Sequence, residues 1–133
     1  VSVGRLASRV SLILKGKNKP QFSPNLPVGD GVIIVNTDKV KFSGNKNNEK
    51  KYYKHTGHPG GIKEITPNKL KEKNKSEDII KKAIKGMLPN SPLFRDLMKN
   101  NLKLYKDSNH PHESQNPKTI DFKSQNRKNL INV

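Results

Sequence analysis

Cysteine is absent from this chain, acidic residues are scarce, and hydrophobic residues make up only 30% of it. Without cysteine, the chain has neither a disulfide framework nor a thiolate that could bind a metal or act as a nucleophile. The longest apolar runs, around Ile33 and Ile79, are far too short to span a membrane. The mean hydropathy of −0.90 predicts a small core, so we expect loops and termini to become ordered on a partner.

The charge of the chain is strongly one-sided. Its 133 residues contain 27 Lys and Arg against 11 Asp and Glu, which gives a net charge of +16 and an isoelectric point near 10.1. Such self-repulsion predicts a polyanionic partner. Lysines far outnumber arginines, which occur only at Arg5, Arg9, Arg95 and Arg127. Because arginine is the better reader of guanine, this balance favours recognition of backbone and shape over base sequence.

The first part of the chain predicts a helix and two strands. Apolar residues recur at helical spacing over residues 4–15, and Gly16 is placed to end that helix. Residues 17–27 hold three prolines and predict an extended, basic connector. The apolar run at residues 31–35 is typical of a central strand covered on both faces. Alternation of lysines with apolar side chains at residues 39–43 predicts a second strand.

Further along, the pattern predicts three helices and an edge strand. A threonine cap and a first-turn proline predict a lysine-rich helix over residues 67–73. We expect Ser76 to cap the next helix, whose broad apolar stripe is typical of a core helix. Another short helix opens at residues 91–92, and residues 102–105 alternate as an edge strand does.

These elements together predict an α/β fold. Helices that alternate with strands favour a layered arrangement around a mostly parallel sheet. The length suits a single domain, which we place at residues 1–105. Beyond Lys106 apolar residues almost vanish, so we expect residues 106–133 to form an extended segment bound to RNA or another partner.

Residues 50–61, Lys-Lys-Tyr-Tyr-Lys-His-Thr-Gly-His-Pro-Gly-Gly, are the most informative stretch. Cations suit phosphate oxygens, tyrosine rings can stack on unpaired bases, and glycines let a backbone come close to a ligand. The alternative interpretation is a strand end followed by a solvated turn. The net charge favours nucleic acid, although strand alternation would turn Tyr52 or Tyr53 inward.

A zinc site is the first competing interpretation. The pairs His55/His58 and His110/His112 offer four ring nitrogens, which tetrahedral zinc could in principle use. Protein zinc sites usually include thiolate or carboxylate, and both pairs lie among Gly, Pro and Lys. We therefore expect no metal, and interpret these imidazoles as partners for RNA phosphates or base edges.

Catalysis has still less support. The glycine-rich segments at residues 44–46 and 57–61 match neither a P-loop nor a dinucleotide fingerprint. The carboxylates are scattered and flanked by lysines, and the sequence implies no base near Ser8 or Ser11. We predict that the chain is not an enzyme and needs no cofactor.

Lysines gather beside turn residues in three clusters. A single lysine is usually part of a solvated face, but three such clusters favour contact with phosphates. If about 6–10 of these cations meet phosphates, affinity should fall by about 10³–10⁵ between 50 and 200 mM salt. The clusters are Lys15, Lys17 and Lys19; Lys46, Lys50, Lys51 and Lys54; and Lys99, Lys103 and Lys106.

An ordered series of motifs extends over residues 4–122. It comprises residues 4–8, 15–20, 29–30, 36–40, 43–46, 50–61, 85–89, 102–105, 110–117 and 120–122. Together these motifs resemble the large-subunit ribosomal protein L-thirteen family, in its universal, bacterial or organellar form. Residues 50–61 resemble that family's Lys-x-Tyr-Tyr-x-His-Ser/Thr-Gly-x-Pro-Gly-Gly signature.

The resemblance implies a three-layer α/β/α fold with a mostly parallel central sheet, basic extended loops and a polar C-terminal tail. It also implies a non-catalytic constituent of the large ribosomal subunit that binds large-subunit rRNA and supports assembly and translation. The implied partners are that rRNA and neighbouring ribosomal proteins, with no membrane and no small-molecule substrate. The alternative is a regulatory protein that binds RNA outside the ribosome.

The chain departs from the family at both ends. Family members usually carry a further strand before residues 4–8, and the residues after Phe122 exceed the bacterial end. With a start at Val1 rather than Met, these features favour a missing leading segment and an organelle ribosome. Mitochondrial ribosomes are the expected location, ahead of plastid ribosomes and the bacterial cytoplasm.

The RNA-binding residues are predicted from the basic clusters, the motif at residues 50–61 and the resemblance. They are Arg5, Lys15, Lys17, Lys19, Lys46, Lys50, Lys51, Tyr53, Lys54, His55, Thr56, Gly57, Arg95, Lys99, Lys103, His110 and His112.

Overall fold

Helices α1 (Val3–Lys15) and α4 (Ser76–Met87) pack against each other at the centre of the computed structural model, which describes residues 1–122. Each presents an apolar stripe to the other, and Leu14 and Ile84 are fully buried. The Lys15 ammonium donates to the Met87 carbonyl at 3.1 Å, which ties the C-terminal ends of the two helices together. The sequence predicted both helices correctly, because their apolar residues follow the helical period closely.

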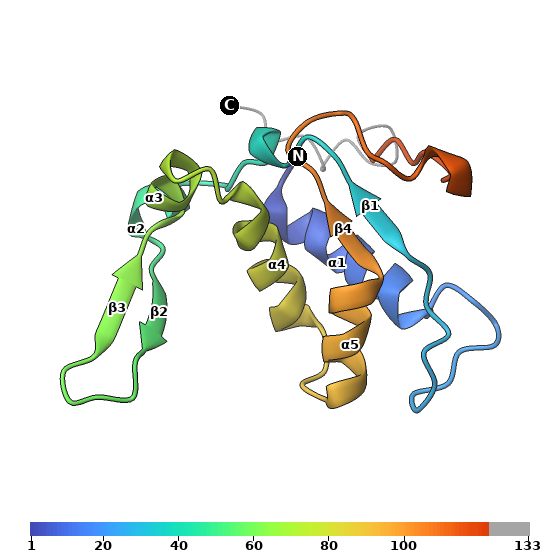
Figure 1. The fold of residues 1–133 in the computed structure, drawn as a ribbon, viewed down its shortest axis with the longest axis horizontal. Coiled ribbons are helices and arrows are strands. Elements are labelled where there is room, and N and C mark those ends of the chain that lie inside the picture. The colour runs from blue at the N-terminus through green and yellow to red at the C-terminus, as the bar shows by residue number, and fades with distance from the viewer. Residues whose placement is uncertain (123–133) are drawn as a thin grey trace.

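Strands β1 (Val32–Ile34) and β4 (Leu102–Leu104) form a parallel pair beside these helices (Figure 1). Ile34 and both leucines of β4 are buried, so the pair completes the core. Helix α5 (Pro92–Asn100) leads directly into β4, and Asn101 accepts a hydrogen bond from the Val32 N–H at 2.7 Å. The α/β class and the parallel pairing predicted from the sequence are confirmed.

Strands β2 (Tyr52–His55) and β3 (Ile62–Ile65) form a separate antiparallel hairpin. Figure 1 shows the hairpin projecting from the body of the molecule, on the side away from β1 and β4. The short helices α2 (Lys46–Glu49) and α3 (Pro67–Glu72) flank its base. The sequence favoured a basic loop with interleaved tyrosines here, with a strand end and a turn as the alternative, and β3 was not predicted.

Three helix boundaries test the predicted caps. Gly16 ends α1 with a φ of +76°, a left-handed conformation that glycine adopts without strain, as predicted. Thr66 caps α3 by accepting a hydrogen bond from the Lys69 N–H at 3.5 Å, also as predicted. The prediction for Ser76 was wrong: it is the first residue of α4, it is buried, and Lys75 takes the cap position without a side-chain bond.

The strand predicted at residues 39–43 was also wrong. The backbone forms a 3₁₀ turn, η1 (Thr37–Lys39), followed by a single parallel bridge between Lys41 and Ser2. Val40 is buried and Phe42 packs against the core, so the alternation of faces was right. A strand needs a neighbour along its length, however, and only Ser2 pairs with this segment in the described residues. The run at residues 31–35 similarly shortens to β1, and its last residue, Val35, is exposed.

The C-terminal segment carries one further turn, η2 (Glu113–Gln115), within residues 106–122. The remainder of the predicted extended segment, residues 123–133, lies outside the described residues. Among the helices of residues 1–122, none combines the length and apolar character required to cross a membrane.

Candidate nucleic-acid interface

The turn of the hairpin places glycines where other residues would be strained. Gly57 has a φ of +87°, which L side chains rarely adopt, and its N–H donates to the His55 Nδ1 at 2.9 Å. The Thr56 N–H donates to the Gly61 carbonyl at 3.0 Å, which closes the loop. Thr56, Gly57 and His58 are all exposed, so the turn presents its backbone and His58 to solvent.

The two tyrosines of β2 point to opposite faces of the strand, because successive side chains of a strand alternate. Tyr52 packs against the core, whereas the Tyr53 side chain is 65% exposed. Lysine ammonium groups lie over the Tyr52 ring, with Lys82 at 4.4 Å and Lys50 at 5.5 Å from the ring centroid. Burial raises the pKa of the Tyr52 phenol because the phenolate would lose its hydration. Tyr52 therefore anchors the hairpin to α4, and Tyr53 is the ring available for stacking on a base.

The antiparallel register brings two lysines directly opposite each other. Lys54 of β2 pairs with Lys63 of β3, and both are exposed. Like charges in such a pair are destabilising, and neither lysine has an ion-pair partner among the described residues. An anion between the two ammonium groups would remove that repulsion.

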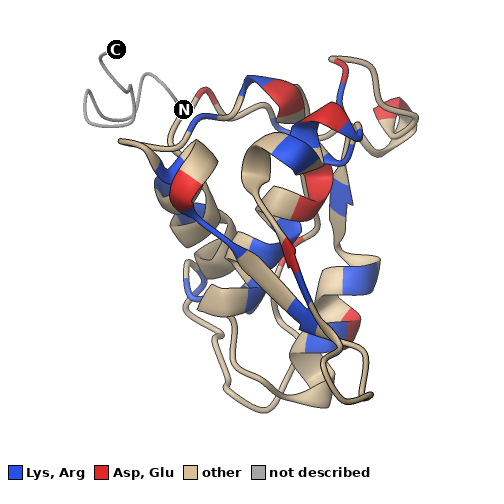
Figure 2. Ribbon diagram, turned by 90° about the vertical axis from the view of Figure 1, so that its left-hand side faces the viewer, with Lys and Arg blue, Asp and Glu red and all other residues tan. Residues whose placement is uncertain are grey.

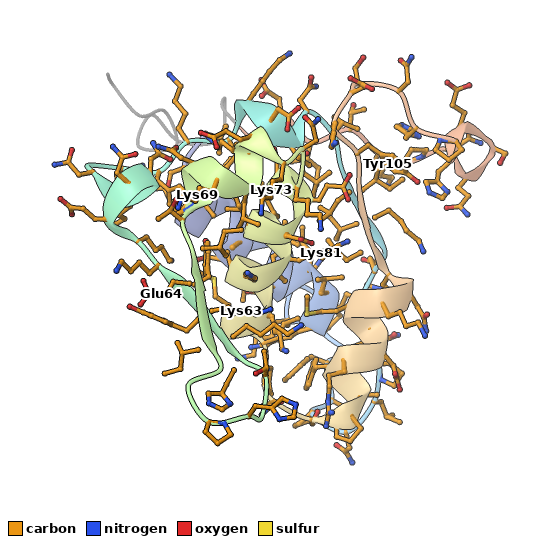
Figure 3. All side chains as sticks on the ribbon, turned by 60° about the vertical axis from the view of Figure 1, so that its left-hand side comes forward. Lys63, Glu64, Lys69, Lys73, Lys81 and Tyr105 are labelled. Atoms are coloured by element: carbon orange, nitrogen blue, oxygen red, sulfur yellow. The ribbon has the colours of Figure 1, made fainter. Side chains whose placement is uncertain are left out.

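The opposite face of the hairpin differs in charge. Figure 3 shows Lys63 and Glu64, neighbours on β3, pointing to opposite sides. The Glu64 carboxylate forms an ion pair with the Lys51 ammonium at 2.7 Å. This contact raises the pKa of Lys51, and Tyr53 makes a smaller contribution in the same direction. Lys51 is thus partly neutralised, so Lys54 and Lys63 are the less compensated cations of the hairpin.

The three lysines at the proline-rich connector, Lys15, Lys17 and Lys19, make different contacts within the protein. Lys19 forms an ion pair with Asp30 at 2.6 Å, and Lys15 binds the Met87 carbonyl. Lys17 lies over the Phe22 ring, 5.8 Å from its centroid, and is exposed. All three predicted phosphate ligands therefore have a contact within the protein, but only Lys15 and Lys19 bind oxygen atoms.

The other predicted cations are exposed on separate elements. Arg5 lies on α1, Lys46 on α2, Arg95 and Lys99 on α5, and Lys103 on β4. Figure 2 shows basic segments on the hairpin and on the helices around it, with acidic segments between them. The structure thus distributes the predicted residues around the molecule instead of gathering them into one patch.

The two histidines of the C-terminal segment form a cluster with Tyr105. The Tyr105 hydroxyl and the His112 Nε2 are 2.8 Å apart, and the rings of His110 and His112 stack with centroids 6.3 Å apart. Tyr105 lies on the far side of the molecule from the hairpin (Figure 3). The histidine pairs are therefore well separated, and the described residues hold no group of three potential metal ligands.

Residues 1–111 match the family model for ribosomal protein L13. The chain belongs to this family. A large ribosomal subunit protein uL13 from Methylobacterium nodulans is 51% identical over 128 residues, which cover 96% of this chain and 83% of the relative. The uL13 of Neorickettsia sennetsu is 50% identical over 96% of this chain and 83% of the relative. That of Geobacter sulfurreducens is 52% identical over 90% of this chain and 82% of the relative.

Within the L13 framework, the structure also shows basic residues that are not among the predicted RNA-binding residues. Lys63 was missed because β3 was not foreseen, although isoleucines at residues 62 and 65 after a glycine-rich turn are compatible with the second strand of a hairpin. Lys82 and Lys85 were interpreted as part of a solvated or RNA-facing side of their helix and were not among the predicted RNA-binding residues. Their spacing places both on the same side of α4, next to Gly86.

Proposed function

We propose that this chain is a structural constituent of the large ribosomal subunit, where it binds large-subunit rRNA and supports assembly and translation without catalysing a reaction. Its membership in the ribosomal protein L13 family supports this role, as do relatives described as large ribosomal subunit proteins. The net charge of +16 supplies the electrostatic complement to RNA.

The observation that carries the proposal is the exposed hairpin with Lys54 opposite Lys63 and Tyr53 on its outer surface. An isolated two-stranded hairpin is only marginally stable in water, and like charges facing each other weaken it further. RNA phosphates would remove the repulsion between Lys54 and Lys63, and an unpaired base would cover Tyr53. The hairpin is thus built to gain stability in the bound state.

The other predicted contacts fit a protein that RNA surrounds. Arg5, Lys17, Lys46, Arg95, Lys99 and Lys103 are exposed on different elements, so several RNA segments would contact different sides of the domain. Four other predicted phosphate ligands also make contacts within the protein, so phosphates bound to them would lie close to the protein surface. They are Lys15, Lys19, Lys50 and Lys51. His55, Thr56 and Gly57 at the hairpin turn would make the closest approach to RNA.

The domain and the C-terminal segment would bind different parts of the subunit. Residues 1–105 would form the domain that docks on rRNA, and residues 106–133 an extended segment running over RNA or a neighbouring ribosomal protein. The contact between Tyr105 and His112 fixes the start of this segment to β4, and leaves His110 beside it. These two histidines would face RNA where the segment leaves the domain.

The ribosome is of the bacterial type, because the relatives described above are bacterial proteins. A ribosome of this type would occur in a mitochondrion, in a plastid or in the bacterial cytoplasm. Fractionation of the source cells decides between them, since a mitochondrial protein would be recovered with purified mitochondria.

Sedimentation of extract through a sucrose gradient tests the function. Nearly all of the protein should travel with the large subunit and should stay there through washes at low salt. Recovery of most of it at the top of the gradient, or on other RNA, would contradict the ribosomal role. Purified protein should also bind transcribed large-subunit rRNA with an affinity that falls steeply between 50 and 200 mM salt, by about 10³–10⁵ for 6–10 phosphate contacts.

A further inference from the structure

An open groove lies between the C-terminal half of α4 and helix α5, outside the hairpin. Its volume is about 510 Å³, within the range of about 300–1,000 Å³ that ligand pockets occupy. Leu88, Phe94 and Met98 supply its apolar lining. Leu88 is buried, while Phe94 and Met98 are only half-buried although they pack against the core. The groove therefore exposes an aromatic ring and a thioether at its base.

Three cations line the same groove. Lys82 and Lys85 come from α4 and Arg95 from α5, and no carboxylate lines it among the described residues. Lys82 also lies over the Tyr52 ring at the base of the hairpin. Lys85 and Arg95 make no ion pair within residues 1–122. Such a rim favours an anionic ligand with an apolar or aromatic part.

Gly86 is the feature that the fold itself leaves unexplained. It lies in the last turn of α4, where glycine is less favourable than alanine by roughly 0.5–1 kcal/mol. Its backbone conformation does not require glycine, and a Cβ atom there would meet nothing within 4 Å. Neither packing nor backbone geometry therefore demands glycine, but the residue lines the groove. A side chain at this position would occupy space that a ligand could use.

The chemistry of the lining points to RNA as the occupant. A nucleotide that has left its helix offers a flat base, which stacks on aromatic side chains, and phosphates on either side of it. Phe94 and Met98 match the base, and Lys85 and Arg95 match the two adjoining phosphates. An acidic peptide would satisfy the cations but would not need a flat space beside Phe94.

We propose that this groove receives one nucleotide extruded from the rRNA, with its base against Phe94 and Gly86 and its phosphates on Lys85 and Arg95. This inference rests on the proposed binding of rRNA and names one point of that contact. It makes Gly86 a residue that determines how closely a base approaches α4.

The test substitutes leucine for each of two glycines in the full chain and compares binding to transcribed large-subunit rRNA. Gly86→Leu fills the groove, and Gly4→Leu is the matched control, because Gly4 is also helical and has nothing within 4 Å of its Cβ position. Both variants should fold with thermal midpoints at or above that of the parent, since leucine favours helix over glycine. Only Gly86→Leu should weaken binding, by about 5- to 150-fold, the range of a lost base stack.

Dimethyl sulfate footprinting on the same complexes identifies the base. The parent and Gly4→Leu should protect one unpaired adenine or cytosine, or, with a carbodiimide reagent, one unpaired uridine or guanine. Gly86→Leu should release that base while the rest of the footprint persists.

The outcomes separate the groove from the wider function. If Gly86→Leu and Gly4→Leu bind rRNA equally with identical footprints, the groove inference is overturned and the rRNA-binding role stands. If Gly86→Leu lowers incorporation into subunits without changing binding to naked rRNA, the groove holds a protein segment, and the nucleotide assignment is wrong. If the parent itself shows no salt-dependent binding to rRNA, both the groove inference and the proposed function fail.

Discussion

At the residue scale, neighbouring side chains of the hairpin serve different purposes because a strand turns successive residues to opposite faces. Tyr52 is an anchor held between the core and two lysines, whereas Tyr53 is exposed. Lys51 has Glu64 as its partner, while Lys54 faces Lys63. In each pair, one residue, Tyr52 or Lys51, is held by contacts within the protein. The other, Tyr53 or Lys54, is exposed and can contact a ligand.

Replacing Lys63 tests the like-charge pair. In the free protein, Lys63→Ala should leave stability unchanged or raise it by about 0.2–1 kcal/mol, because the repulsion with Lys54 disappears. Binding to rRNA should weaken, and the slope of log affinity against log salt should become shallower by about 1. Thermal unfolding and filter binding from 50 to 200 mM salt measure the two effects.

Lys73→Ala is a suitable control for this experiment, since it removes the same charge from an exposed position at the end of α3. Loss of stability in Lys63→Ala, with unchanged rRNA binding, would mean that the lysine pair supports the free hairpin and not the complex.

Replacing Tyr52 tests its burial through the pH dependence of stability. The pKa of the folded-state phenol is raised above the ordinary value of 10.0, so its contribution to stability is complete below pH 10 and is lost as pH rises through the folded pKa. Tyr52→Phe should behave like the parent at pH 7 and should lose less stability above pH 10. Urea unfolding at pH 7 and at alkaline pH measures this difference. The exposed Tyr53→Phe should keep the parent's alkaline loss, and equal curves for all three proteins would contradict the burial of Tyr52.

At the element scale, the hairpin is an extension that depends on its turn and its base. The fold fixes the base through Tyr52 and Ile65, which pack against the core, while the strand residues from Tyr53 to His55 and from Ile62 to Glu64 are exposed. Its order therefore depends on local backbone geometry far more than that of α1 or α4. The hairpin can adjust to RNA without disturbing the core.

Replacing Gly57 tests this independence. Gly57→Ala places a side chain at a φ of +87°, which costs the turn roughly 1–2 kcal/mol. Amide hydrogen exchange should speed up across β2 and β3 and should stay unchanged in α1 and α4. Gly4→Ala is the control, and faster exchange throughout the molecule would show that the hairpin and core unfold together.

At the scale of the whole molecule, a small core carries a highly charged surface. The α1–α4 interface and the β1–β4 pair contain most of the buried apolar residues. The predicted basic residues lie on several elements, namely α1, α2, β2, α5 and β4, instead of on one. Such a shape suits a protein enclosed by RNA, and makes its stability in isolation depend on few side chains.

Replacing one isoleucine in the core and another on the hairpin tests this distribution. Ile84→Ala removes a fully buried side chain and should cost about 2–5 kcal/mol, a large part of the roughly 5–15 kcal/mol of a typical domain. Ile62→Ala, at a side chain that is 63% exposed, should stay within about 0.5 kcal/mol of the parent. Urea unfolding measures both values. A large loss in Ile62→Ala would show that the hairpin is part of the cooperative core.

The charge, the long helices, the caps at Gly16 and Thr66, and the ordered motifs that mark the family could all be predicted from the amino-acid sequence. These features depend on residues close together along the chain, where helical period and turn chemistry act directly. Three features required the folded chain: Lys54 faces Lys63, Tyr52 rather than Tyr53 turns inward, and Gly86 lines a groove with Phe94 and Arg95. Strand register and helix packing bring these residues together from distant positions, and no local pattern specifies such contacts. The absence of a strand at residues 39–43 has the same cause, because a strand requires a partner that the local sequence does not supply.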